Sequence, residues 1–168
     1  MECRKAEHAD LSRIMEIIKD AQESLKELGI DQWQNGYPSK EVILHDMDCG
    51  YGYVFLEEGN IIATAAVSFD GEETYERIYE GDWLSTGNYA VIHRLAVARN
   101  HKGKGLSHEV MRQIELLCLH YRLPSIKIDT HEDNSPMQHV IKKNGYTHCG
   151  VIYVEDGTKR LAFEKLLN

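Results

Sequence analysis

The segment spanning residues 89–131 constrains the fold of this chain more than any other. It contains an apolar run, VIHRLAV, then the turn RNHKGKGLS, and then a stretch whose apolar residues recur at helical spacing. Pro124 ends that helix, and SIKIDTH after it alternates as a strand does. Two strands joined by a helical crossover can run parallel in one sheet. The segment therefore predicts a strand-helix-strand unit.

Hairpins are predicted on both sides of this unit, so strands and helices do not alternate throughout. The other expected elements are a strand at 2–5, helices from Asp10 to near Gly29, at 39–48 and at 135–143, a hairpin with its turn at Glu58-Gly59-Asn60, and a hairpin with its turn at 155–158. This order predicts an α/β (α+β) fold with a mixed central sheet of about six or seven strands and about four flanking helices. The length, 168 residues, suits a single domain covering 1–168.

Composition excludes several classes of function. A formal net charge of -8 makes nucleic acid a poor partner, since such binders usually present a basic face. No apolar run approaches the roughly 20 residues that span a bilayer, and MECRKAEHADLSRIMEIIKD lacks the apolar core of an export signal. The four cysteines form no CxxC pair, which predicts reduced thiols in a cytoplasmic protein and no zinc site.

The glycine-lysine turn does not match either familiar nucleotide motif. A Walker loop requires Ser or Thr after Gly-Lys, where this chain has Gly105, and a dinucleotide fingerprint requires a third glycine where it has His108. The turn nevertheless leads into a helix N-terminus, whose free N–H groups and dipole favour an anion. Lys102 and Lys104 add positive charge. A phosphate-binding loop and a plain solvated turn both fit these residues.

Two motifs resemble those of the GNAT superfamily of acetyltransferases. RLAVARNHKGKGLS resembles its acyl-CoA-binding motif, Arg/Gln-x-x-Gly-x-Gly/Ala, with Lys102, Gly105 and Ser107 at the three defined positions. IDTHEDNSPMQHVIKKNGY is similar to the family's strand-Asn-helix-Gly-aromatic segment. The order of elements agrees over nearly the whole chain, which looks most like small stand-alone bacterial members. The resemblance implies the GNAT acyl-CoA N-acyltransferase fold, with acetyl-CoA as co-substrate and no metal.

The resemblance also implies a set of cofactor-binding residues. In the family, acetyl-CoA lies between two parallel strands, here 89–98 and 125–131, with pantetheine on the first strand and pyrophosphate on the turn. The residues implied are Leu95, Ala96, Val97, Lys102, Gly103, Lys104, Gly105, Leu106, Ser107 and Asn134. Asn134 also fits the cap of the helix at 135–143, and the two roles are compatible.

His93 is the candidate general base. Family members often carry Glu or His at this position, and an imidazole as a residue type titrates near neutral pH. Regular alternation would put Val91, His93, Leu95 and Val97 on one face of the strand. An imidazole packed in the sheet and bonded locally is the alternative.

The proton donor to the departing thiolate is a departure from the family pattern. Ile141 occupies the position at which many members carry a tyrosine, and Tyr146 fills the position of a core aromatic residue. Tyr89, Tyr121 or water remain as donors.

The acceptor side is the least defined part of the sequence. The resemblance places the acceptor near the loop containing Trp33 and Tyr37, although Trp33 could equally anchor that loop to the core. The acidic residues between 70 and 82 could attract a cationic amine or simply form a solvated loop. Asp129, His131 and His139 lack ligand spacing for a metal.

The expected function is acetyl-CoA-dependent N-acetyl transfer to an amine, by direct attack in a ternary complex. A small-molecule primary amine is the preferred acceptor. The alternatives are a protein or peptide α-amine acetyltransferase and a non-catalytic acyl-CoA-binding sensor, which the missing tyrosine keeps open. A homodimer is compatible with the sequence.

Overall fold

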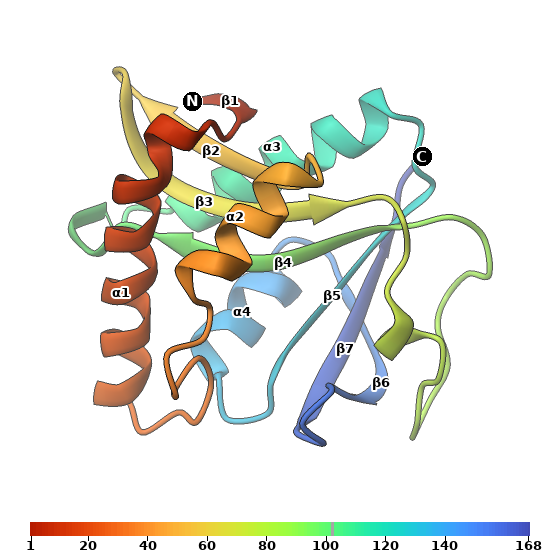
Figure 1. The fold of residues 1–168 in the computed structure, drawn as a ribbon. Helices are drawn as coiled ribbons and strands as arrows, with labels where there is room; N and C mark the ends of the chain where they lie inside the picture. Colours follow the sequence, from red (N-terminus) through yellow and green to blue (C-terminus); the bar gives the residue numbers. More distant parts are fainter. Residues whose placement is uncertain (102) are drawn as a thin grey trace. The chain divides into compact units, whose positions relative to one another are not determined.

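The computed structural model describes residues 1–101 and 103–168 (Figure 1). These residues form two compact units. The units consist of Met1–Val67 with His93–Val110, and of Ser68–Ile92 with Met111–Asn168. Strand β4 (Ala90–Val97) and helix α3 (Leu106–His120) contribute residues to both. The strand order β1-β2-β3-β4-β5-β7-β6 confirms the predicted mixed sheet. That the whole chain acts as a single domain stays a prediction.

In the first unit, two helices cover a set of antiparallel strands. Strand β1 (Glu2–Lys5) pairs with β2 (Gly52–Glu57), and β2 pairs with β3 (Asn60–Ser68). Helices α1 (Leu11–Glu27) and α2 (Lys40–Asp48) pack on these strands through one apolar cluster, on the side facing the viewer in Figure 1. Its buried members are Ile14, Ile17, Ile18, Ala21, Ile43, Val54, Leu56, Ala96 and Ala98.

Local signals account for where these elements begin and end. Glu58 and Gly59 have φ of 49° and 77°, as a two-residue hairpin turn with both central residues left-handed requires, so the predicted turn is confirmed. Gly29, at φ 72°, follows the end of α1. Ser39 caps α2, since its hydroxyl accepts a hydrogen bond from the Val42 N–H at 3.3 Å.

Asp10 stands at the predicted cap position of α1 but makes no capping bond to that helix. Its carboxylate instead accepts two hydrogen bonds from Arg4, at 2.8 and 3.0 Å, and one from the Glu7 N–H at 2.8 Å. The hydrogen bond with Arg4 is the main cause that holds the pKa of Asp10 below its usual value, against the opposing effect of burial. Asp10 therefore ties β1 to the start of α1.

Replacing Asp10 by asparagine should make stability less dependent on pH in the acidic range. A carboxyl with a lowered folded-state pKa stabilises the fold above its unfolded pKa of about 3.9, and this stabilisation is lost as the pH falls through the folded value. Asp10→Asn should thus lower the free energy of unfolding by about 1–2 kcal/mol near neutral pH. The difference from wild type should shrink below about pH 4 in urea unfolding curves, and a constant difference would contradict the assignment.

The second unit contains the predicted parallel pair and the closing hairpin. Residues Ala90–Ile92 of β4 pair in parallel with β5 (Ser125–His131), and α3 carries the chain between these strands. Strand β5 pairs antiparallel with β7 (Lys159–Leu166), which pairs antiparallel with β6 (Thr147–Tyr153). Helix α4 (Ser135–Lys143) connects β5 to β6. The strand-helix-strand prediction is confirmed.

The acidic segment 70–82 of the second unit is held against β6 by its backbone. Tyr79 and Val151 of β6 exchange two backbone hydrogen bonds, each of 2.8 Å. The buried Tyr75 hydroxyl donates to Asp129 at 2.6 Å. The acidic side chains are nevertheless mostly solvated; the exposed ones are Asp70, Glu73, Glu76, Glu80 and Asp82. The alternative of a solvated loop therefore holds for the side chains and fails for the backbone.

The next segment along the chain, from Trp83 to Tyr89, contacts a buried carboxylate and a buried lysine. Glu164 of β7 accepts hydrogen bonds from the Leu84 N–H at 2.6 Å and from the Ser85 hydroxyl at 2.5 Å. The Lys127 ammonium lies 4.2 Å from the centre of the Trp83 ring and also contacts the Tyr89 ring. Burial lowers the pKa of Lys127.

All four cysteines are free thiols, and burial raises the pKa of Cys3 to about 11 and of Cys118 to about 12. Within residues 1–101 and 103–168, no helix is both long and apolar enough to cross a membrane.

Candidate active site

Strand β4 is irregular in the middle. Residues 90–92, 96 and 97 are buried, whereas 93–95 are half-buried. Arg94 has a φ of 52°, a left-handed conformation that residues with a Cβ rarely adopt within a strand. The expected alternation of Val91, His93, Leu95 and Val97 on one face assumes a regular strand and is therefore interrupted at Arg94.

Arg94 is held by groups from two other elements of the first unit. Its Nε and Nη2 donate to the two carboxylate oxygens of Asp46 on α2, at 2.7 and 2.6 Å. Its Nη1 donates to the Tyr37 hydroxyl at 2.9 Å. Asp46 is 3% exposed. Burial opposes the charged form of Arg94, but the contacts with Asp46 and Tyr37 outweigh it and raise the pKa of Arg94 above its usual value.

The turn after β4 has the backbone geometry that its glycines permit. Residues Arg99–His101 form a short 3-10 turn, and Gly103 and Gly105 have φ of 79° and 71°. Both glycines are left-handed, which explains why glycine stands at these positions. Leu106 then begins α3, so the turn ends at a helix N-terminus whose first N–H groups have no acceptor within the helix. Lys102 lies outside the described residues.

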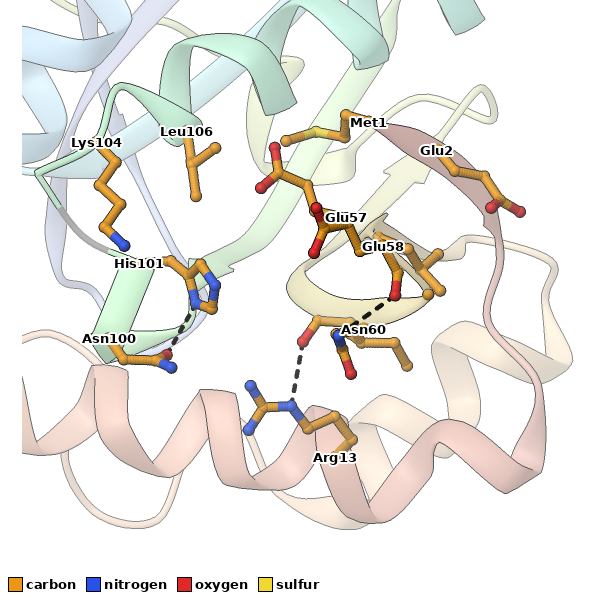
Figure 2. Close-up of a pocket in the computed structure, with 13 residues that line it drawn as sticks. Met1, Glu2, Arg13, Glu57, Glu58, Asn60, Asn100, His101, Lys104 and Leu106 are labelled. Carbon is orange, nitrogen blue, oxygen red and sulfur yellow. Dashed lines mark hydrogen bonds between the residues drawn. The ribbon is translucent and has the colours of Figure 1, made fainter.

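An open depression of about 1340 Å³ adjoins this turn (Figure 2). Figure 2 shows His101 and Lys104 on one side of it and Glu57 and Glu58 on the other, with Arg13 of α1 beneath. Among the described members of the predicted cofactor set, Lys104 and Leu106 line this depression. The side next to the turn is therefore cationic and the side next to the β2–β3 hairpin is acidic.

The structure places the groups considered for proton transfer in different surroundings. His93 is half-buried in β4 and has an interaction partner within the chain. Ile141 and Tyr146 are buried, and burial raises the pKa of Tyr146, which fits its expected place in the core. The Tyr89 hydroxyl accepts a hydrogen bond from the Glu72 N–H at 3.2 Å, and Tyr121 is exposed. The roles of His93 and of any tyrosine stay predictions.

The two aromatic residues of the α1–α2 loop differ in exposure. Trp33 packs against the apolar cluster of the first unit, so it does anchor the loop to the core. Tyr37 is 43% exposed, and its backbone carbonyl accepts a hydrogen bond from Gln22 of α1 at 2.7 Å. Of the two, Tyr37 is the one presented to solvent and joined to β4 through Arg94. Their role in binding an acceptor stays a prediction.

Asn134 caps α4 in the second unit. Its side-chain oxygen accepts a hydrogen bond from the Met137 N–H at 3.1 Å, which confirms the capping role. It is 7% exposed and makes a further interaction within the chain. Its expected contact with the cofactor stays a prediction.

Two of the three groups considered as metal ligands, Asp129 and His131, have other contacts. Asp129 accepts hydrogen bonds from Tyr75 and, at 3.3 Å, from Arg160. The His131 ring nitrogen Nδ1 accepts from the Asp133 N–H at 3.0 Å. Over the described ranges 1–101 and 103–168, no group of three His, Cys, Asp or Glu side chains is placed to hold a metal ion.

Asp46 and Arg94 were not singled out from the sequence. The signal that could have found Arg94 is a cation inside the apolar run VIHRLAV, since a charge in such a strand requires a partner. Its partner lies 48 residues away in the sequence, and nothing local identifies it.

Comparisons with known proteins agree on one family. The sequence model of the Acetyltransferase (GNAT) family matches residues 13–146. A GNAT-family acetyltransferase from Streptococcus agalactiae superposes with a TM-score of 0.91 at 34% identity, over 99% of this chain and 95% of that one. No curated protein sequence matches this chain.

More distant structures share the fold alone. A protein described as a putative phosphinothricin N-acetyltransferase has a TM-score of 0.68 at 17% identity, covering 99% of this chain and 98% of that one. The ribosomal-protein-alanine N-acetyltransferase of Brucella melitensis has a TM-score of 0.68 at 16% identity, covering 99% and 100%.

Proposed function

This chain belongs to the GNAT family of acetyltransferases, which are N-acyltransferases, and we propose that it moves the acetyl group of acetyl-CoA to a small-molecule primary amine. The observation that carries this proposal is the turn after β4, where Gly103 and Gly105 are left-handed and lead directly into the N-terminus of α3. Backbone N–H groups at such a turn, together with the helix dipole, favour a phosphate group.

The proposal assigns the parts of coenzyme A to separate stretches of the chain. The backbone of Leu95–Val97 binds the pantetheine arm, and the turn from Lys102 to Ser107 binds the pyrophosphate. Lys104, on the cationic side of the depression, adds charge near this turn. Asn134 is proposed as a further cofactor contact that also caps α4.

The proposed reaction needs a neutral amine. The nitrogen lone pair attacks the thioester carbonyl carbon, the C–N bond forms and the C–S bond breaks, and coenzyme A leaves as a thiolate. The nitrogen loses its extra proton to His93, directly or through water. The leaving thiolate, with an ordinary thiol pKa of about 8.5, takes a proton from water or from an unassigned donor. Backbone N–H groups of β4 would stabilise the negative charge that develops on the carbonyl oxygen.

The choice of a small cationic amine is supported by the charge of the second unit. Its 70–82 segment exposes several carboxylates that attract cations. The two distant fold neighbours are named for a small-molecule acceptor and a protein acceptor, so a peptide α-amine is the competing substrate class. The four free thiols support a cytoplasmic location as part of the proposal.

A thermal shift assay tests the cofactor part of the proposal. Acetyl-CoA at about 100 times its Kd should stabilise the folded protein by about 2.7 kcal/mol, because it binds the folded chain and not the unfolded one. For a chain of this size, each kcal/mol should raise Tm by about 2–4 °C. Stabilisation by ATP or NAD without any by acetyl-CoA would refute coenzyme A as the ligand.

A further inference from the structure

Arg94 combines two features that are each unfavourable by themselves. It places a guanidinium within a mostly apolar strand, and its backbone is left-handed at φ 52°. A residue with a Cβ keeps this conformation only where its surroundings hold it there. Such positions concentrate where a protein needs a particular backbone orientation, so the surroundings of Arg94 identify what is being held.

The surroundings are a clamp formed by Asp46 and Arg94. Two parallel hydrogen bonds of 2.6 and 2.7 Å join a carboxylate to a guanidinium in the fork geometry that fixes both groups. The Asp46 and Arg94 side chains are 5% and 15% exposed, so water competes little with the pair. Tyr37 accepts a third hydrogen bond from Arg94, which extends the contact to the α1–α2 loop.

Arg94 lies between the two parts of β4 that have a role in the proposed reaction. His93 precedes Arg94, and the backbone of Leu95–Val97 follows it. The dihedral angles of Arg94 set how the peptide groups after it are turned relative to His93. If Arg94 relaxed to an extended conformation, the N–H and C=O groups that follow would rotate.

We propose that Arg94 and Asp46 are positioning residues for acetyl transfer: their buried ion pair holds β4 in the left-handed conformation that aims the Leu95–Val97 backbone at the pantetheine arm. This inference rests on the proposed function of β4. The link through Tyr37 connects the same clamp to the loop assigned to the acceptor.

Two double variants separate backbone positioning from stability. Arg94→Ala/Asp46→Asn removes the clamp without leaving a buried unpaired charge, and alanine prefers φ below zero. Arg94→Gly/Asp46→Asn removes the same clamp, but glycine adopts a left-handed φ readily. Both variants lose similar contacts, so any difference in cofactor affinity between them reports the backbone conformation.

The measurement is calorimetric titration of coenzyme A, well below the Tm of each variant. The Arg94→Ala/Asp46→Asn variant (the alanine pair) should bind coenzyme A about 5–30-fold more weakly than wild type. At 1.4 kcal/mol per tenfold this is about 1–2 kcal/mol, which is the free energy that the left-handed conformation costs a residue with a Cβ. The glycine pair should bind within about twofold of wild type. With an amine that turns over, the alanine pair should show a raised KM for acetyl-CoA that the glycine variant restores.

Asp10→Asn is the matched control, because Arg4 and Asp10 form another doubly hydrogen-bonded pair in the same unit. It should lower the Tm and leave coenzyme A affinity unchanged. Equal affinities for wild type and both double variants would overturn the inference while leaving the proposed function intact. If wild type itself failed to bind, the proposed function would fall first. Should the alanine pair not fold, Asp46→Asn alone decides: weaker binding than the Asp10→Asn control supports the clamp, and equal binding refutes it.

Discussion

Alanine in place of His93 is expected to lower kcat for amine acetylation by about 10²–10⁴-fold, the range typical of losing a general base. A neutral amine becomes positively charged at nitrogen as it attacks the thioester, so a group nearby must accept the extra proton. His93 is the half-buried imidazole of β4, and it directly precedes the clamped Arg94. Because it is not assigned to cofactor binding, coenzyme A affinity should stay close to that of wild type.

The pH dependence of kcat/KM makes this prediction specific. A general base acts in its deprotonated form, so the wild-type kcat/KM should rise with pH, and this rise should be absent in His93→Gln. His139→Ala, which changes an exposed histidine of α4, is the control and should keep both the wild-type rate and its rise with pH. A His93→Ala enzyme with wild-type kcat and an unchanged profile would assign the base elsewhere.

The second large effect concerns stability and arises at Gly81. A Cβ added there would lie 1.9 Å from the backbone carbonyl oxygen of Cys149. The neighbouring Tyr79–Val151 backbone hydrogen bonds hold the Gly81 segment against β6, so neither backbone can move away without losing them. Gly81→Ala should therefore lower the free energy of unfolding by about 3 kcal/mol or more, measured by urea unfolding.

Gly87→Ala is the matched control in the same connection. No heavy atom among the described residues lies within 4 Å of a Cβ built at Gly87, so the change should cost no more than about 0.5 kcal/mol. Equal stability of the two variants would mean that the segment around Gly81 is not docked on β6. Such a result would also contradict the interpretation that the acidic segment is held against β6 with its carboxylates exposed.

The elements that could be predicted from the sequence are those with local signals. Asn134 was predicted as a helix cap, and Gly29 as the end of a helix, because each acts on backbone groups only a few residues away. The strand-helix-strand unit followed from periodicity and from Pro124 at the end of the helix. Asp10 shows the limit of such signals: aspartate often caps helices, but the Asp10 carboxylate accepts a hydrogen bond from Arg4 instead.

What could not be predicted depends on partners far apart in the sequence. The conformation of Arg94 is set by Asp46 and Tyr37, and the alternation assumed for β4 fails for that reason. The sequence did not show whether the acidic segment is a solvated loop or is bound to the sheet. Its composition is the same in both cases, and in the structure its carboxylates are exposed while its backbone is bound to β6. The turn of Gly103 and Gly105 was identifiable by its glycines, yet its ligand required the family resemblance.

Turnover tests directly whether this chain transfers an acetyl group to a small amine. The wild-type protein is incubated with acetyl-CoA and a panel of small primary amines and peptides, and both the release of free thiol and the acetylated amine are followed by absorbance and mass spectrometry. We expect thiol release that depends on one class of small amine, with the acetyl group recovered on its nitrogen. Tight binding of coenzyme A without turnover on any amine or peptide would contradict this expectation and identify the chain as an acyl-CoA-binding sensor.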